Sequence, residues 1–93
     1  MVLWRPLAEG RRVGFAVSRR IGSAVTRNRG RRRLREAYRR EQGALQADIA
    51  VMFVARPAVI NRRFADLVEE MRRTLGMLNR SAQRAKVPKE ARS

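Results

Sequence analysis

The residues with the clearest chemical potential form the run TRNRGRRRLREAYRR, residues 26–40. Residues 27–40 carry eight arginines and a single acid, Glu36. A guanidinium can bind phosphate through two parallel hydrogen bonds. In a helix these like charges repel one another, each close pair costing roughly a few tenths of a kcal/mol. A bound RNA or DNA backbone would neutralise that repulsion and release counterions, so the run predicts a helix that binds nucleic acid.

Residues able to perform catalysis on their own are missing. The chain contains no histidine and no cysteine, which excludes the usual neutral-pH general base and makes zinc and most transition-metal sites very unfavourable. Asp66, Glu69 and Glu70 share a predicted helix with arginines and resemble salt-bridge partners, not a catalytic pair. The serines have no evident base to activate them. The polypeptide is therefore predicted to hold no catalytic residue and no metal, and any chemistry must come from another molecule.

Positive charge is concentrated in the first half of the chain. Of the net charge of +15, residues 1–40 contribute +11, residues 41–79 are neutral and residues 80–93 contribute +4. A basic surface confined to one part of a small domain is typical of a polyanion binder. Nucleic acid is the first interpretation. An anionic membrane surface is the alternative, although the basic helix lacks the bulky apolar face of an interfacial helix.

The cellular compartment can be inferred from what the sequence lacks. No apolar run reaches the length of a membrane span, and MVLWRPLAEG does not resemble a signal peptide. The absence of cysteine fits a reducing compartment. These features predict a cytoplasmic protein without a membrane partner.

Three segments are predicted to be strands, and they must position the arginine helix. Residues 13–18 are rich in Val and Phe, residues 2–7 form a shorter segment, and residues 48–55 form a continuous apolar run. An unbroken run of this length is typical of a strand covered on both faces. A strand–helix–strand unit predicts that the two longer strands are parallel, with the helices packed on one sheet.

Two helices complete the predicted order (β)β–α–β–α. The first is capped by Ser23 or Thr26 and ends near Gln42. The second begins at Asn61 and has one apolar face. The residues of that face are Phe64, Leu67, Val68, Met71, Leu75 and Leu78.

One side of the arginine helix is expected to pack on the sheet. This side is lined by Leu34, Ala37, Tyr38 and Glu41, with Val25 expected a turn or two before them. The arginines occupy nearly all other positions. Residues 1–79 form the predicted domain. The polar, basic residues 80–93 form a tail that is predicted to be disordered.

The run VGFAVSRRIGSAVTRNRGRRRLREAYR resembles the signature of the bacterial ribonuclease P protein component. That family reads approximately as a strand ending in V-S-K-K, followed by G-x-A-V-x-R-N-R-x-K-R-x-L-R-E-A-F/Y. Ser18-Arg19-Arg20 stands at the serine and basic pair, and Arg27-Asn28-Arg29 stands at the R-N-R element. The run DIAVMFVARPA resembles the family's next strand, so the resemblance spans about residues 11–79. The other positions in register are Gly22, Ala24, Val25, Arg31, Arg32, Leu34, Arg35, Glu36, Ala37 and Tyr38.

The resemblance implies an α/β fold, more narrowly an α+β two-layer sandwich. This architecture is ribonuclease P protein-like, or ribosomal protein S5 domain 2-like, with a left-handed β-α-β crossover, whereas the great majority of crossovers are right-handed. The family normally begins with a helix and a longer strand region. Only about ten residues precede the V-G-F strand here, so we expect an N-terminally short member without that helix. The family also usually has Ile or Val at Gly30, and a glycine there costs up to about 1 kcal/mol relative to alanine.

The same resemblance implies the function and the partners. The chain would be the protein subunit of ribonuclease P, binding the catalytic RNA and precursor tRNA as one protein monomer per RNA, and assisting removal of the 5′ leader. The RNA and its bound magnesium ions would perform the hydrolysis, with no metal held by the protein. Phe15 and Val17 could belong to a cleft for the leader, although core packing is the alternative for Phe15. The implied RNA-binding residues are Arg19, Arg20, Arg27, Asn28, Arg29, Arg31, Arg32, Arg35 and Arg39.

Other functions compete with this interpretation. A general RNA-binding or ribosome-associated protein without a role in cleavage is the main alternative. A stand-alone nuclease is disfavoured by the lack of histidine and of clustered acids. A DNA-binding helix is compatible with the charge, but no helix-turn-helix pattern precedes the arginine helix.

Overall fold

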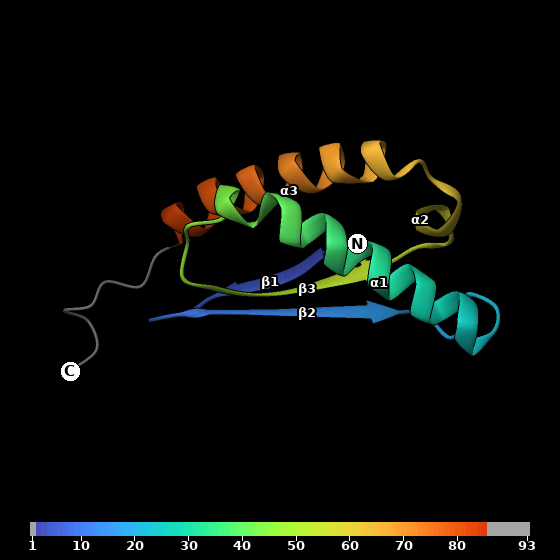
Figure 1. Ribbon diagram of the computed structural model, residues 1–93. Helices are drawn as coiled ribbons and strands as arrows, with labels where there is room; N and C mark the ends of the chain where they lie inside the picture. Colours follow the sequence, from blue (N-terminus) through green and yellow to red (C-terminus); the bar gives the residue numbers. More distant parts are fainter. Residues whose placement is uncertain (1, 86–93) are drawn as a thin grey trace.

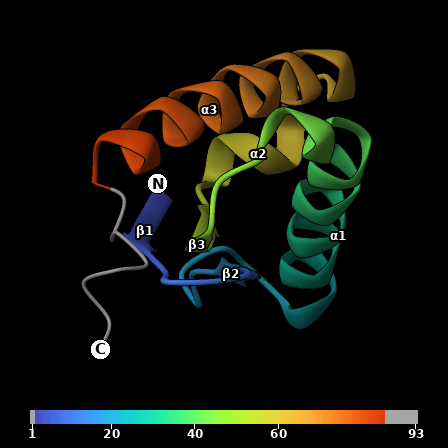
Figure 2. The same ribbon diagram turned by 90° about the vertical axis from the view of Figure 1, so that its left-hand side faces the viewer.

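The computed structural model describes residues 2–85, which form a two-layer sandwich with the helices on one face of a sheet (Figures 1 and 2). This is the predicted α+β arrangement. Within this part of the chain, no helix is both long and apolar enough to cross a membrane. The elements in chain order are β1 Val2–Pro6, β2 Arg11–Val17, α1 Ala24–Glu41, the short 3-10 helix η1 Gln42–Ala44, β3 Ile49–Ala55, α2 Pro57–Asn61 and α3 Phe64–Arg84.

The sheet has three strands in the order β1-β3-β2. β3 pairs antiparallel with β1 and parallel with β2, so that Val51 lies between Trp4 and Val13. A parallel pair needs a long connection, and α1 provides it. The three predicted strands and the parallel pairing are confirmed.

Within the described part of the chain, residues 2–85, only one face of the sheet is covered. Along β3 the side chains of Ile49, Val51, Phe53 and Ala55 are buried, whereas Met52 between them is 40% exposed. The prediction that this strand is covered on both faces was wrong. Its apolar run continues onto the open face, which is available for a partner.

The core lies between the covered face and the helices. Leu67, Met71, Leu75 and Leu78 of α3 are buried, as their helical spacing predicts. From the sheet and α1, the rings of Phe15, Tyr38 and Phe53 meet at centroid distances of 5.7 to 6.0 Å. These aromatic contacts attach the arginine helix to the sheet.

The start of α1 is set by its capping residue. The Ser23 hydroxyl accepts a hydrogen bond from the backbone N–H of Thr26 at 3.3 Å, which confirms Ser23 as the cap. Val25, however, is 79% exposed and does not belong to the packed side. Val25 lies nine positions before Leu34, and nine steps of about 100° place the two on opposite sides of a helix.

The segment after β3 differs from prediction. The second helix was expected to begin at Asn61, but Asn61 is the last residue of the separate helix α2, and α3 begins at Phe64. Pro57 stands at the start of α2, where its missing N–H costs nothing. The extended backbone of Arg62 and Arg63 then separates the two helices.

The end of α3 also lies further along the chain than expected. Residues 80–84, predicted as part of a disordered tail, continue the helix, and Ala82 is only 4% exposed. Burial of this small residue against the core explains the longer helix. Residues 86–93 lie outside the described residues, so the tail prediction stays a prediction for them.

Gly30 occupies a close contact between α1 and α2. The Ile60 side chain fills the space beside it, and a Cβ built at Gly30 would lie 3.6 Å from Ile60 Cδ1, which is an ordinary van der Waals distance. Ile60 therefore compensates for the side chain that Gly30 lacks.

We expect Gly30→Ala to raise the free energy of unfolding by about 0.5–1 kcal/mol, because it removes the conformational cost of glycine in a helix without a clash. Urea unfolding of both proteins measures the difference. The control is Gly22→Ala, which should destabilise because Gly22 has φ +60°. Destabilisation by Gly30→Ala would show that α1 and α2 approach more closely than described.

Candidate RNA interface

Four arginines on the outward side of α1 are free for a ligand. Arg29, Arg32, Arg35 and Arg39 are exposed, and within residues 2–85 none of them makes a hydrogen bond or ion pair. At intervals of three and four residues they lie on one side of the helix, opposite Leu34. The sequence placed all four in the RNA-binding set. Their free guanidiniums form a dense set of phosphate donors.

The first turns of α1 are organised by side-chain contacts within the helix and with the loop before it. Arg27 Nη1 donates to the carbonyl oxygen of Gly22 at 2.8 Å, and Arg31 Nη1 donates to Asn28 Oδ1 at 3.1 Å. Each guanidinium has five N–H donors, so both arginines keep donors for a ligand. Arg27, Asn28 and Arg31 were also predicted to bind RNA. They lie on the same helix as the four free arginines, and these hydrogen bonds orient their side chains.

The loop between β2 and α1 carries the other two predicted RNA-binding residues. Arg19 and Arg20 are exposed. Ser18 shapes this loop by accepting from the backbone N–H groups of Arg20, at 3.2 Å, and Ile21, at 3.0 Å. Ile21 is only 5% exposed and anchors the loop. The two arginines therefore stand next to the N-terminus of α1 and extend its basic surface.

The remaining arginines of α1 have partners inside the protein. Arg33 donates to the backbone carbonyls of Val59 and Arg62, and the guanidiniums of Arg33 and Arg40 lie over the ring of Phe64. Fewer arginines of α1 are therefore without a partner in residues 2–85 than the sequence suggested. The sequence did not predict which arginines of α1 contact the protein and which remain available for a ligand.

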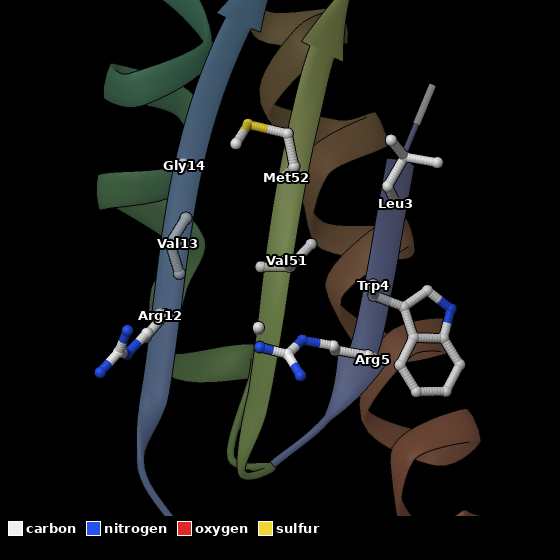
Figure 3. Close-up of a pocket in the computed structure, with 9 residues that line it drawn as sticks. Leu3, Trp4, Arg5, Arg12, Val13, Gly14, Val51 and Met52 are labelled. Carbon is white, nitrogen blue, oxygen red and sulfur yellow. The ribbon is translucent and has the colours of Figure 1, made fainter.

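A groove of about 470 Å³ lies on the open face of the sheet (Figure 3). Met52 crosses from β3 toward Gly14, where the missing side chain leaves room for it. Arg5 and Arg12 lie near one end of the groove. Its lining residues are Leu3, Trp4, Arg5, Arg12, Val13, Gly14, Ala50, Val51 and Met52.

Phe15 and Val17, the predicted leader-cleft residues, do not face this groove. Both pack against the core on the covered side of the sheet. The pairing of Phe15 with the buried Phe53 determines this orientation, because paired residues on neighbouring strands share a face. Gly14 and Ala16 alternate with them and face the open side. Core packing is therefore the observed role of Phe15 and Val17.

The acidic side chains of residues 2–85 do not gather into a metal-binding cluster. Among residues 2–85, no group of three or more acidic, histidine or cysteine side chains could hold a metal ion. Glu69 and Glu70 pair with arginines on the surface, as the sequence suggested: Glu69 with Arg72 and Arg73, and Glu70 with Arg62. The arrangement is suited to binding a polyanion.

Residues 1–79 match the family Ribonuclease P. The chain belongs to this family. It is the protein subunit of ribonuclease P, a component of an endoribonuclease of tRNA processing. Family membership implies ribonuclease P RNA as its partner.

Solved structures agree with the family assignment of this ribonuclease P protein. It is similar to the ribonuclease P protein from Thermotoga maritima, with 26% identity, a TM-score of 0.72, and coverage of 82% of this chain and 74% of that one. The Staphylococcus aureus protein shares the fold at 20% identity and a TM-score of 0.66, with coverage of 83% and 72%. Among curated proteins, no sequence matches.

Proposed function

We propose that the outward side of α1 binds ribonuclease P RNA, and that the open face of the sheet binds the 5′ leader of precursor tRNA. The protein would thereby assist leader removal by the RNA. The observation that carries this proposal is a set of four exposed guanidiniums that make no hydrogen bond or ion pair within residues 2–85. They lie on one side of a helix whose other side is packed. Binding of RNA phosphates would give each of them a partner and release counterions.

The groove on the open face supports the leader proposal. Leu3 and Met52 supply exposed apolar surface, 56% and 40% exposed, and Arg5 and Arg12 lie beside it. Surfaces that bind single-stranded nucleic acid combine these features, because bases pack on the apolar part while cations follow the backbone.

We expect the double variant Arg5→Ala/Arg12→Ala to weaken binding of precursor tRNA. Loss of two single-strand phosphate contacts should reduce the slope of log affinity against log salt by about 1.4. The measurement is a salt titration of binding to the protein–RNA complex. Mature tRNA, which has no leader, is the control and should bind both proteins equally; an equal loss for the two tRNAs would contradict a leader site.

The crossover from β2 through α1 to β3 is proposed to be left-handed. In Figure 2 the viewer looks along β2 and β3 from their beginnings, and the chain passes from β2 to α1 on the right and returns to β3 further left. This counterclockwise path supports the proposal.

Magnesium is proposed to be held by the RNA. The described residues do not fit a metal site, since no cluster of acidic side chains is present among them. We further propose one protein monomer per RNA, with precursor tRNA as the second partner, in the cytoplasm. No step of the hydrolysis is assigned to a protein side chain.

The test is cleavage of precursor tRNA by ribonuclease P RNA at low millimolar magnesium, with and without the protein. We expect the protein to restore processing that the RNA alone performs poorly under these conditions. Salt-sensitive binding to any RNA without stimulation of cleavage would instead support a general RNA-binding protein.

A further inference from the structure

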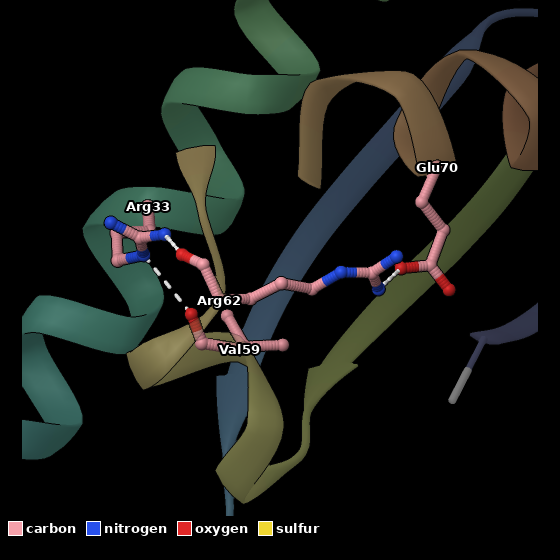
Figure 4. Close-up of polar contacts among 4 residues, drawn as sticks. All are labelled: Arg33, Val59, Arg62 and Glu70. Carbon is pink, nitrogen blue, oxygen red and sulfur yellow. Dashed lines mark hydrogen bonds and ion pairs between the residues drawn. The ribbon is translucent and has the colours of Figure 1, made fainter. Parts of the chain in front are cut away.

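Arg33 lies among the RNA-facing arginines but makes contacts of a different kind. Its side chain is partly buried, and its guanidinium is directed at the segment between α2 and α3 (Figure 4). Nε donates to the carbonyl oxygen of Val59 at 3.0 Å, and Nη2 donates to the carbonyl oxygen of Arg62. Both acceptors lie at the C-terminal end of α2, where carbonyl groups have no partners within the helix.

Two further contacts attach the same side of α1 to this segment. One turn before Arg33, the Ile60 side chain of α2 packs beside Gly30 of α1. The Arg33 guanidinium also lies 5.7 Å from the centre of the Phe64 ring, in the first turn of α3. Arg62 in turn forms an ion pair with Glu70 of α3, as Figure 4 shows. Arg33 thus joins α1 to both α2 and α3.

We infer that Arg33 is a positioning residue, which fixes the rotation of α1 so that Arg29, Arg32 and Arg35 face the RNA. It does so through the Val59 and Arg62 carbonyls and not by contacting a phosphate. Residues 32 and 33 differ by about 100° around the helix, so neighbouring arginines of one run perform different tasks. This inference rests on the proposed function, because it takes the outward side of α1 to bind RNA. The contacts of Arg33 within the protein are independent of that proposal.

The planar guanidinium is required for this role. Nε and Nη2 reach two carbonyls at once while the flat group lies over Phe64. Lysine keeps the charge but has a single ammonium group and no flat face. A phosphate contact would tolerate lysine, whereas a fixed bridge between two carbonyls would not.

The first experiment compares Arg33→Lys with Arg32→Lys in the absence of RNA. We expect Arg33→Lys to lower Tm by roughly 5–10 °C and Arg32→Lys to leave it unchanged. Because the chain has no cysteine, spin labels on Glu36→Cys and Gln83→Cys report the placement of α1 relative to α3. The label distance distribution should broaden only with Arg33→Lys; a wild-type Tm and distribution would overturn the inference.

The second experiment measures binding to ribonuclease P RNA at several salt concentrations. Arg33→Ala should weaken affinity about tenfold with an unchanged salt slope, because the helix is misplaced while no phosphate contact is lost. Arg32→Ala should reduce the slope by about 0.9. An equal reduction for Arg33→Ala would overturn the inference. If the wild-type protein does not bind this RNA, the proposed function fails, while the measurements without RNA still decide the role of Arg33.

Discussion

Replacing Arg32 and Arg35 by alanine is expected to weaken binding to ribonuclease P RNA about a hundredfold, equivalent to roughly 2.7 kcal/mol. Both guanidiniums are exposed and have no partner within the described part of the chain, so the double variant removes contacts with the ligand and none with the protein. The salt slope should fall by about 1.8, which corresponds to two duplex phosphates. Tm should stay the same or rise slightly, because repulsion within α1 is reduced.

The matched control removes two arginines from another helix. Arg72→Ala/Arg73→Ala changes the net charge by the same amount on α3. Both residues are exposed, and among residues 2–85 they pair only with Glu69. Exposed ion pairs of this kind contribute little to stability. We expect this variant to bind almost as tightly as the wild type. Equal losses for the two double variants would mean that total charge, not the outward side of α1, determines affinity.

The contrast between Arg32 and Arg33 marks the limit of prediction from sequence. The arginine run, its helix and the capping Ser23 follow from local patterns and are confirmed. The partners of Arg33, however, lie 26 and 29 residues further along the chain. Helical spacing cannot show that backbone carbonyls in and just after α2 will accept hydrogen bonds from Arg33, while neighbouring Arg32 makes none within residues 2–85.

The sheet shows a related limit. Periodicity identified the strands, but the face on which Phe15 lies depends on its pairing with Phe53, which is a tertiary contact. The unbroken apolar run of β3 suggested burial on both faces, since hydrophobicity alone does not distinguish a core from an exposed binding surface. Val25 is different, because counting nine residues back from Leu34 would have placed it on the outward side.

Phe53→Ala is expected to cost about 3–5 kcal/mol of unfolding free energy. The Phe53 ring is 3% exposed and contacts both Phe15 and Tyr38, so its removal leaves a cavity where β2, β3 and α1 meet. A domain of this size has only about 5–14 kcal/mol in total. Tm should therefore fall by roughly 15–30 °C in a thermal scan, and RNA binding should be lost in parallel with the fold.

Met52→Ala is the matched control, because the neighbouring residue points to the opposite face of the same strand. Its side chain is 40% exposed and lines the groove on the open face, so alanine should cost less than about 1 kcal/mol. If this face binds the leader, Met52→Ala should weaken binding of precursor tRNA and leave the binding of ribonuclease P RNA unchanged. Comparable losses of stability for the two variants would show that the open face is covered in solution. A large loss of stability for Phe53→Ala alone, and a loss of precursor tRNA binding without unfolding for Met52→Ala, would show that the two faces of β3 have different roles. The covered face would maintain the fold, and the open face would contact the substrate.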